Sequence, residues 1–589
     1  MLDQSTQVYG KDKEALQPVA AALEGDSRIS ISYEAGAALV KMIYEIKGGY
    51  AEVRMPVPLG EPGIVSFPGS FLPEGENLKF IIPVMQGMLW DGRGEPFERT
   101  VGEGGHLGFA MPLIGYLGEK GGLLYTAETQ DDVLWSVGKD EKGKKHAFNL
   151  QAASLGTMRY ERIARLIPVD PDIVKLAKAY RMKIMEQKRF KGWEEKISER
   201  PDLERLFGAL MCFIGYCEDG LDYAAECRKL KKYGFDRALV YPGRFNMYYP
   251  DILMGGKPAI NLSRDVLEEI KALGYDVAPW SWLNEALDDG TEKIRKMYRK
   301  NAAGEIIKHW AIEDQQWYQV CSTFLEEYQK AAIKNTIPEM TWDHFDVLTC
   351  ASVGECYATD HPNHRGKLIP KTEDREWIKK ALRAGWVDGR AISSEYFNDA
   401  YSLESDFGSV KAWPQYGPWP YWPIPLTMLV YHDSIIHSWW ELHSYNNAWR
   451  GGTGWLMHFE YGGGRPRLMA SMDALYGCPP DVFPFGSQYG YTGEGQKTFL
   501  YKYRFEDPEV QIALREALPV AELHKKIGKL EMVDFKILSE DGYLQQSAFA
   551  DGTGIIANFS RDFYSSTRGP CQYAEGIGTI GPESWKIVK

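Results

Sequence analysis

The chain has 589 residues, and its 68 Lys and Arg against 81 Asp and Glu give a formal net charge of −13 at pH 7. This acidic balance, without a long basic run, argues against nucleic acid or an anionic membrane surface as a partner. No run of about eighteen apolar residues occurs, so we expect no membrane-spanning helix. We expect a soluble chain, cytoplasmic as given, or secreted or periplasmic if a leader peptide has been removed.

Length and cysteine usage limit the organisation. Single cores rarely grow beyond about 300 residues, so we expect roughly two to four domains. The eight cysteines are scattered without a Cys-x-x-Cys pair, which does not indicate a disulfide framework. The 18 Trp and 34 Tyr would suit stacking on sugar rings, although large β-rich cores use the same residues.

The first part of the chain reads as strands and turns. Short runs such as "SRISISYEA" and "LKFIIPVMQGMLW" alternate or stay apolar between Gly, Pro and Asp clusters. This pattern is typical of an antiparallel sandwich, and we expect an N-terminal β-sandwich over 1–165. The charged segment "DIVKLAKAYRMKIMEQ" that follows has helical periodicity, which predicts a helical linker over 166–205 with a break at Pro201.

The pattern then changes to alternating strands and helices. "KKYGFD" and "KALGYD" each place a glycine between a helical run and a short apolar strand, which is typical of repeating βα units. Seven or eight such strands, including "LFGALMCFIGY", "RAISSEYF" and "IPLTMLVYH", predict a (β/α)8 TIM barrel over 206–528. The remaining strand-like runs, joined by "ADGTG" as a hairpin, predict a small C-terminal β-sheet domain over 529–589.

Two acidic residues end apolar strands of the expected barrel. Asp346 ends "MTWDHFD" and Glu395 ends "RAISSE", so both are expected at the carboxyl-terminal rim, where barrel enzymes place catalytic groups. A carboxylate pair can cleave a glycoside, one as nucleophile or stabiliser and the other as general acid. Asp343 competes with Asp346, but the two have opposite parity on a strand. A rim carboxylate can also cap a helix or pair with an arginine.

Further side chains are expected to line the same pocket. "APWSW" places Trp280 and Trp282 at alternate positions of a strand, where they could stack on a sugar ring or pack under a helix. His432 and Asp433, after "LVY", are candidates for binding sugar hydroxyls, and Asp433 is the reserve carboxylate. Tyr241, Asp343 and His344 complete the expected lining: all come from strand segments of the barrel.

No metal or cofactor is expected. "DHPNH" contains Asp360, His361 and His364, but their spacing matches no strong zinc signature, and we interpret them as part of an ordered loop. Structural calcium is conceivable but not indicated. "GGTGWL" and "EYGGGR" lack the Lys-Ser/Thr ending of a phosphate loop, which argues against a nucleotide.

The segments "FIIPVMQGMLWDG", "HFDVLT", "HPNHRG", "SSE", "IPLTMLVYH" and "FADGTGIIANF" together resemble glycoside hydrolase families 101 and 129. These are the endo- and exo-α-N-acetylgalactosaminidases and their uncharacterised relatives. The resemblance implies a retaining α-glycoside hydrolase acting on a carbohydrate substrate, with Asp346 as nucleophile and Glu395 as acid/base. The long Asp346-to-Glu395 connection and the segment "YHDSIIHSWWELHSYN" depart from that clan, which leaves the sugar and its linkage open.

Three other functions stay open at this stage. An inverting hydrolase or a carbohydrate lyase could use the same cleft, and a catalytically inactive carbohydrate-binding protein could keep the same architecture. The oligomeric state is not predicted by the sequence.

Overall fold

The structure is a computed structural model. It describes residues 15–69, 77–102, 108–214, 221–242, 246–247, 262–288, 290–312, 315–335, 340–411, 421–439, 445–446, 465–492, 495–560, 571–573 and 578–588. Within these ranges, no helix has both the length and the apolar character needed to span a bilayer.

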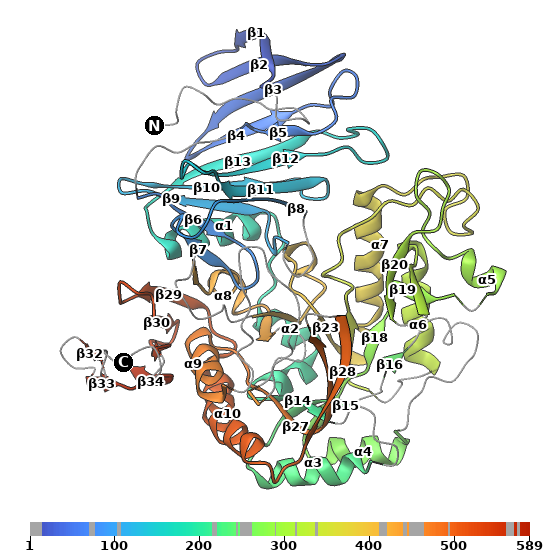
Figure 1. The fold of residues 1–589 in the computed structure, drawn as a ribbon, viewed down its shortest axis with the longest axis vertical. Helices are drawn as coiled ribbons and strands as arrows, with labels where there is room; N and C mark the ends of the chain where they lie inside the picture. The colour runs from blue at the N-terminus through green and yellow to red at the C-terminus, as the bar shows by residue number, and fades with distance from the viewer. Residues whose placement is uncertain are drawn as a thin grey trace.

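The first part of the chain folds into two antiparallel sheets, at the top of Figure 1. The larger sheet has the spatial order β1-β2-β3-β4-β13-β10-β9-β6-β7-β25, and the smaller has the order β5-β12-β11-β8. The strands of this part are β1 (Gln17–Leu23), β2 (Arg28–Ala35), β3 (Ala38–Lys47), β4 (Tyr50–Met55), β5 (Val65–Phe67), β6 (Lys79–Ile82), β7 (Met88–Trp90), β8 (Phe97–Gly102), β9 (Leu113–Leu117), β10 (Gly122–Ala127), β11 (Val133–Lys139), β12 (Lys145–Gln151) and β13 (Arg162–Val169).

Buried aromatic side chains pack the two sheets together. Trp135 of β11 stacks on Phe109 with ring centroids 4.8 Å apart and contacts Tyr125 of β10 at 5.7 Å. The Tyr125 hydroxyl donates to the Phe67 carbonyl of β5 at 2.6 Å. Aromatic pairs of this kind contribute about 0.5–1.5 kcal/mol beyond the area they bury. The alternating runs of the sequence thus form two packed sheets, as expected.

One strand of the larger sheet comes from the second half of the chain. β25 (Tyr421–Pro423) pairs antiparallel with β7, with Tyr421 opposite Trp90 and Pro423 opposite Met88. Tyr421 and Trp90 are both buried. The ten-stranded sheet therefore needs residues from two distant parts of the sequence.

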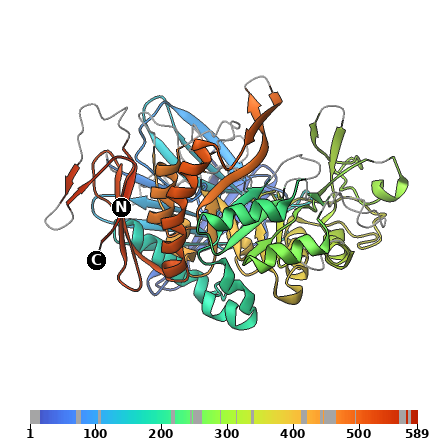
Figure 2. The ribbon, with the colours of Figure 1, turned by 90° about the horizontal axis from the view of Figure 1, so that it is seen from below.

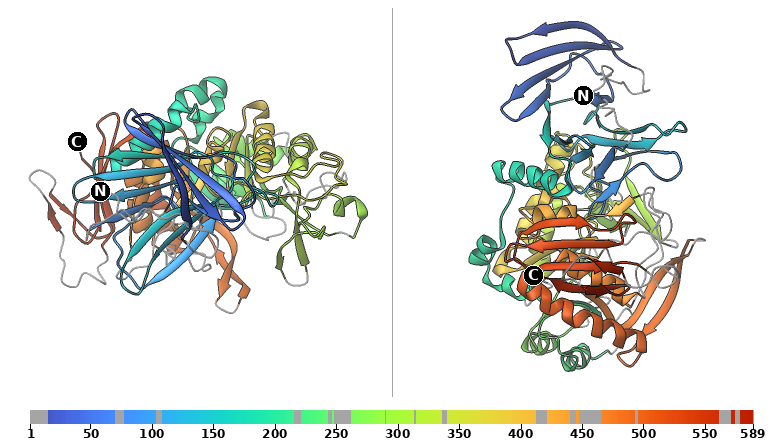
Figure 3. Two further views of the ribbon diagram at one scale, coloured as in Figure 1. Left: turned by 90° about the horizontal axis from the view of Figure 1, so that it is seen from above. Right: turned by 90° about the vertical axis from the view of Figure 1, so that its left-hand side faces the viewer.

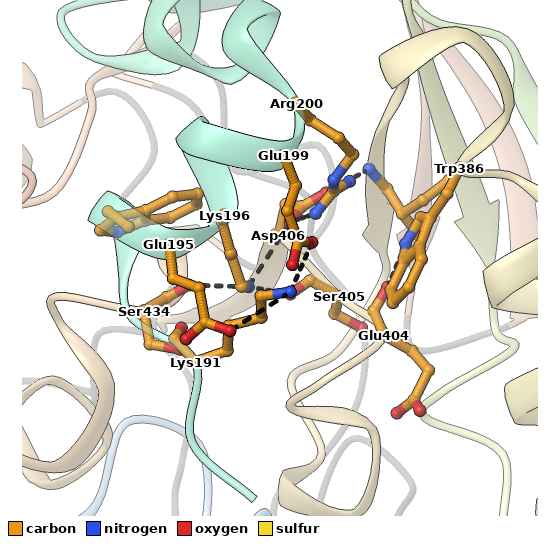
Figure 4. A network of polar contacts seen from close by, with 12 residues as sticks. Lys191, Glu195, Lys196, Glu199, Arg200, Trp386, Glu404, Ser405, Asp406 and Ser434 are labelled. Carbon is orange, nitrogen blue, oxygen red and sulfur yellow. Dashed lines mark hydrogen bonds and ion pairs between the residues drawn. The ribbon is translucent and has the colours of Figure 1, made fainter.

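Helices connect this part to the next: α1 (Ile173–Glu186), α2 (Trp193–Glu199) and the short η1 (Pro201–Leu206). Figure 4 shows how α2 is anchored. Arg200 donates to both carboxylate oxygens of Asp406 at 2.7 and 2.6 Å, and Lys196 Nζ donates to the carbonyls of Ser405 and Ser434 at 2.7 and 2.9 Å. Because Asp406 directly precedes a strand, this buried network holds α2 at the amino-terminal ends of the neighbouring strands.

The middle of the chain alternates helices with parallel strands. One sheet has the order β17-β15-β14-β27-β28 and the other β16-β18-β22-β23-β24-β26. The strands are β14 (Leu210–Ile214), β15 (Ala238–Pro242), β16 (Asn246–Met247), β17 (Tyr275–Val277), β18 (Trp280–Trp282), β22 (Trp342–Asp346), β23 (Ala391–Ser394), β24 (Phe407–Lys411), β26 (Ile436–Trp439), β27 (Asp481–Thr492) and β28 (Gly495–Tyr503). The helices are α3 (Tyr223–Lys232), α4 (Arg264–Ala272), α7 (Lys371–Ala384), η3 (Val387–Gly389), η4 (Asp399–Tyr401), α8 (Leu426–Tyr431), α9 (Pro466–Tyr476) and α10 (Pro508–Ile527).

The two glycines expected to end helices do so. Gly234 and Gly274 follow α3 and α4 with φ of 101° and 90°, a backbone conformation that favours glycine. Each leads towards a buried parallel strand, β15 or β17. The repeated strand–helix units of the sequence are therefore present.

One local expectation was wrong. "IPLTMLVYH" forms helix α8 rather than a strand: the run is buried on every side, so it carries no periodicity that could distinguish the two. The first turn of α3 is capped by Asp222, whose side chain accepts from Ala225 N.

An additional segment separates β18 from β22. It contains β19 (Glu285–Leu287), α5 (Glu292–Arg295), β20 (Lys308–Ile312), β21 (Gln315–Gln319), η2 (Ser322–Phe324) and α6 (Leu325–Asn335). The three strands form their own antiparallel sheet. In Figure 2 this green to yellow-green part lies at the right, opposite the red C-terminal strands. Together with the loop after β22 it has a hydrophobic cluster separate from the main core.

The last part of the chain is a four-stranded antiparallel sheet that packs against α9. The right panel of Figure 3 shows its strands side by side, next to the orange helices. Its strands are β29 (Met532–Ile537), β30 (Leu544–Phe549), β31 (Gly554–Asn558) and β34 (Ser584–Val588), while β32 (Cys571–Tyr573) and β33 (Gly578–Ile580) form a separate pair. The hairpin expected at "ADGTG" joins β30 and β31.

Candidate active site

Two acidic side chains lie at the carboxyl ends of neighbouring parallel strands. Asp346 is the last residue of β22, and Glu395 directly follows β23. Phe345 pairs with Ser394 in register, and the Glu395 N–H donates to the Phe345 carbonyl at 3.1 Å. The acids are only 8 % and 1 % exposed. They end adjacent strands at one edge of the sheet, as expected from the sequence, while their chemical roles stay a prediction.

A strained turn directly follows Asp346. Val347 has a φ of 48°, which is rare for a β-branched residue and costs about 1–3 kcal/mol. In this conformation its N–H donates to Glu395 Oε2 at 3.0 Å, and Cys350 Sγ donates to the same oxygen at 3.2 Å. Because strain of this kind concentrates at functional sites, the turn marks this edge of the sheet as a candidate site.

Uncharged side chains lie beside the acids. His344 shares a strand face with Asp346, because it is two residues away. Its Nδ1 lies 2.8 Å from the Ser393 hydroxyl, and its ring meets the Tyr241 ring edge-on at 5.4 Å. Burial lowers the pKa of His344 to about 3, so the ring is neutral at neutral pH. Burial also raises the pKa of Tyr241 well above its usual value. The structure therefore brings Tyr241 and His344 together near the candidate site.

Asp343 points to the other face of β22. Its carboxylate accepts from Ser281 Oγ at 3.0 Å and from Gln329 Nε2 of α6. Burial raises the pKa of Asp343 to about 6. The expectation that Asp343 lines the sugar pocket is therefore corrected: strand alternation directs this side chain between the sheet and α6.

Trp280 and Trp282 lie in β18, the strand on the other side of β22. Their backbone positions are in register with His344 and Asp346, respectively. The placement of their side chains lies outside what the structure describes. Their role in stacking on a sugar ring stays a prediction.

His432 and Asp433 lie elsewhere. They follow α8 and precede β26, so they are at the amino-terminal side of that strand rather than at its carboxyl end. His432 ring nitrogens lie 2.6 Å from the Leu530 carbonyl and 2.9 Å from the Gly477 carbonyl. Asp433 accepts two hydrogen bonds from Arg181 of α1, both at 2.7 Å. The prediction that both residues line the pocket is therefore wrong: they join α8 to α1 and to the C-terminal part. The prediction failed because α8 was expected to be a strand that ends at the pocket.

Sequence reasoning missed Val347 and Cys350. Both lie in the stretch directly after Asp346. The positive φ of Val347 could not be predicted from the sequence, because valine normally avoids this conformation. The hydrogen bond from Cys350 to Glu395 depends on a single turn of the chain after Val347, in which Ala351 N donates to the Val347 carbonyl. Among the described residues, no metal-like cluster of His, Cys, Asp or Glu includes Asp346 or Glu395.

Comparison with solved structures shows which fold these elements form. The chain superposes on the α-N-acetylgalactosaminidase NagBb from Bifidobacterium bifidum in its GalNAc complex with a TM-score of 0.74, at 18 % identity, over 94 % of this chain and 92 % of that one. The Gal-NHAc-DNJ complex of the same protein gives a TM-score of 0.73 at 17 % identity, over 95 % and 97 %. The chain thus has the same overall fold as NagBb. No family model matches the sequence, and no curated protein matches it either.

Proposed function

We propose that the protein is a retaining glycoside hydrolase that cleaves an α-linked sugar from a glycan or glycoconjugate. Asp346 acts as nucleophile on the anomeric carbon, and Glu395 protonates the leaving oxygen and then activates water. The observation that carries the proposal is the placement of two buried carboxylates at the ends of adjacent parallel strands. A glycosidase with this mechanism needs two such acids on either side of one bond.

Retention needs the two carboxyl groups close together: retaining enzymes place them about 5–5.5 Å apart, against about 6.5–9.5 Å for inverting enzymes. Phe345 and Ser394 pair in register and directly precede Asp346 and Glu395. The two acids therefore start from neighbouring strands, whose backbones lie about 4.8 Å apart. The surroundings of the two acids also differ, because the Val347 N–H and the Cys350 thiol both donate to the Glu395 carboxylate.

A (β/α)8 barrel would place these acids as required. In one run of strands in each sheet, neighbouring strands are parallel and follow one another in chain order. These runs are β14-β15-β17 in one sheet, with β27 closing on β14, and β18-β22-β23-β24-β26 in the other. Residues 278–279 alone separate β17 from β18. We therefore interpret the two sheets as one barrel with Asp346 and Glu395 at its carboxyl-terminal rim.

The comparison with NagBb supports a proposal for the substrate class. NagBb is named as an α-N-acetylgalactosaminidase and was solved with GalNAc. We infer an α-linked galactose-type sugar, with N-acetylgalactosamine as the first candidate. The uncharged faces of Tyr241 and His344 would border the ring, and no cofactor is required for this chemistry.

A panel of aryl α- and β-glycosides tests the proposal. Turnover is expected on α-configured galactose-type substrates alone, and NMR of the first product should show the α anomer. A β-configured first product would indicate inversion, and an ultraviolet-absorbing unsaturated product would indicate a lyase. Sugar binding by calorimetry without turnover on any substrate would leave a carbohydrate-binding protein instead.

A further inference from the structure

The structure brings two cysteines to the histidines of "DHPNH". Cys321 follows β21, while Cys356 lies in the loop between β22 and α7, which also carries His361 and His364. All four are buried, with His364 the most exposed at 7 %. One sulfur or ring nitrogen from each lies within 4.8 Å of the others.

Two of the sulfur–nitrogen distances fit a tetrahedral centre. Cys321 Sγ lies 3.5 Å from His364 Nε2, and Cys356 Sγ lies 3.7 Å from His361 Nδ1. Zinc binds thiolate sulfur at about 2.3 Å and imidazole nitrogen at about 2.0–2.1 Å. At tetrahedral angles these bond lengths separate sulfur from nitrogen by about 3.6 Å. Both pairs therefore already have the spacing that zinc requires.

Each histidine is oriented by its other ring nitrogen. His361 Nε2 lies 3.1 Å from the Tyr298 carbonyl, and His364 Nδ1 lies 2.7 Å from the Lys367 carbonyl. A carbonyl can only accept, so in a neutral ring the proton is on the outer nitrogen and the inner nitrogen has a lone pair. Metal-binding histidines are held in this way.

The two inner nitrogens face each other. His361 Nδ1 and His364 Nε2 are 2.8 Å apart. Two lone pairs at this distance repel each other, so a proton or a metal ion is needed between them. A zinc ion bound by both nitrogens at tetrahedral angles would set them about 3.3 Å apart, slightly farther than they lie here. The orientation of the rings is thus a second observation, independent of the cysteines, that points to a ligand.

We propose that Cys321, Cys356, His361 and His364 bind one Zn²⁺ as a structural site. A set of two sulfurs and two nitrogens favours zinc over calcium or magnesium, which take oxygen ligands. Two thiolates also balance the charge of the ion. Because protein side chains fill all four positions, the site is closed and has no place for a reacting water. This proposal does not depend on the glycosidase activity.

The site departs from what the sequence predicts. No metal was expected, because "DHPNH" alone offers only two nitrogens at a spacing without a zinc signature. The structure adds Cys321 from the other side of β22 and leaves Asp360 out, since the Asp360 carboxylate pairs with Lys300 at 2.9 Å. Distant ligands of this kind cannot be recognised from local spacing.

The ion would join two segments that flank β22. Cys321 belongs to the additional segment after β18, and the other three ligands belong to the loop that begins directly after Asp346. Closing this cross-link restricts the loop and thereby the turn at Val347. Its main expected effect is on stability, since binding free energy at a structural zinc site is folding free energy.

Metal analysis of the purified full-length protein tests the site. About one zinc per chain is expected, and replacement by Co²⁺ should give the visible bands of a tetrahedral centre with a thiolate charge-transfer band. Cys356→Ala should lose the zinc and these bands and lower Tm. Cys227→Ala, at a buried cysteine of α3, is the matched control and should keep the zinc and the cobalt bands.

Wild-type spectra keep the proposal falsifiable if Cys356→Ala does not fold. A wild-type protein without zinc that gives no cobalt bands would overturn it, leaving a hydrogen-bonded cluster only. A Cys321–Cys356 disulfide, detected as two missing thiols without reductant, would overturn it as well. Zinc that Cys356→Ala retains in full would show that the metal is bound elsewhere.

Discussion

The backbone N–H of Val347 donates to Glu395 Oε2 at 3.0 Å, so the residue after one acid holds the other acid in place. The link is a main-chain group in a strained turn, so it depends on the backbone conformation of Val347. It fixes the relative position of the two carboxylates before any substrate arrives, which is the preorganisation that catalysis requires.

Glu395→Gln tests the acid/base role. Activity on substrates with poor leaving groups should fall by about 10²–10⁴-fold, because general acid catalysis is lost, while activated aryl glycosides should lose much less. The measurement is kcat/KM on both substrate classes. Equal losses on the two classes would contradict the acid/base role. Addition of azide to Glu395→Ala should restore turnover and give an α-glycosyl azide.

Asp346→Asn tests the nucleophile. Turnover should be abolished on all substrates, since no covalent intermediate can form. A slow fluorinated α-glycoside should label the wild-type peptide that contains Asp346, as seen by mass spectrometry. Asp343→Asn is the matched control on the opposite face and should keep kcat within about tenfold. A label on Asp343 would reverse the assignment.

Val347→Gly tests the strained turn. Glycine adopts a positive φ without strain, so we expect Tm at least equal to that of the wild type and a severalfold lower kcat, because the Glu395 anchor loosens. Asp388→Gly is the control, since Asp388 has a φ of 58° in an exposed turn of η3. It should leave kcat unchanged. Loss of stability in Val347→Gly would argue against stored strain.

Asp406→Asn tests the network that anchors α2. Removing a charge from a buried ion pair leaves Arg200 and Lys196 with uncompensated charge, and we expect a loss of about 3–5 kcal/mol. Glu326→Gln is the comparison, because the Glu326–Lys330 pair is exposed and should contribute less than about 0.5 kcal/mol. Denaturant unfolding measures both. Similar small losses would mean that α2 is held by packing alone.

His344 predicts a loss of stability in acid. Its folded pKa is about 3, below the unfolded value of about 6.5. The unfolded chain therefore binds the extra proton, and stability present above pH 6.5 is lost as the pH falls towards 3. His344→Gln should flatten this decline by up to about 1.4 kcal/mol per pH unit. Unchanged slopes of unfolding free energy against pH would contradict the shift.

Local sequence patterns predicted the parts of the fold that have a clear hydrophobic periodicity or a helix-ending glycine. Gly234 and Gly274 ended helices where expected, and strand parity separated Asp343 from Asp346. α8 was misread because a fully buried run has no polar face. The domain limits at 165, 205 and 528 stay predictions.

Contacts between distant segments could not be predicted in the same way. The bond from Val347 to Glu395 depends on tertiary packing of two strands, and the pairing of Cys321 with His364 depends on a segment inserted before β22. Neither leaves a spacing signal, because loops of any length can connect such residues.

The contribution of β25 to the ten-stranded sheet limits how this protein can be divided. A fragment of the N-terminal residues alone would leave the β7 edge without its partner strand β25. Open, apolar strand edges recruit other chains. The N-terminal sandwich and the strand–helix part therefore form one folding unit. Either part expressed alone should be insoluble.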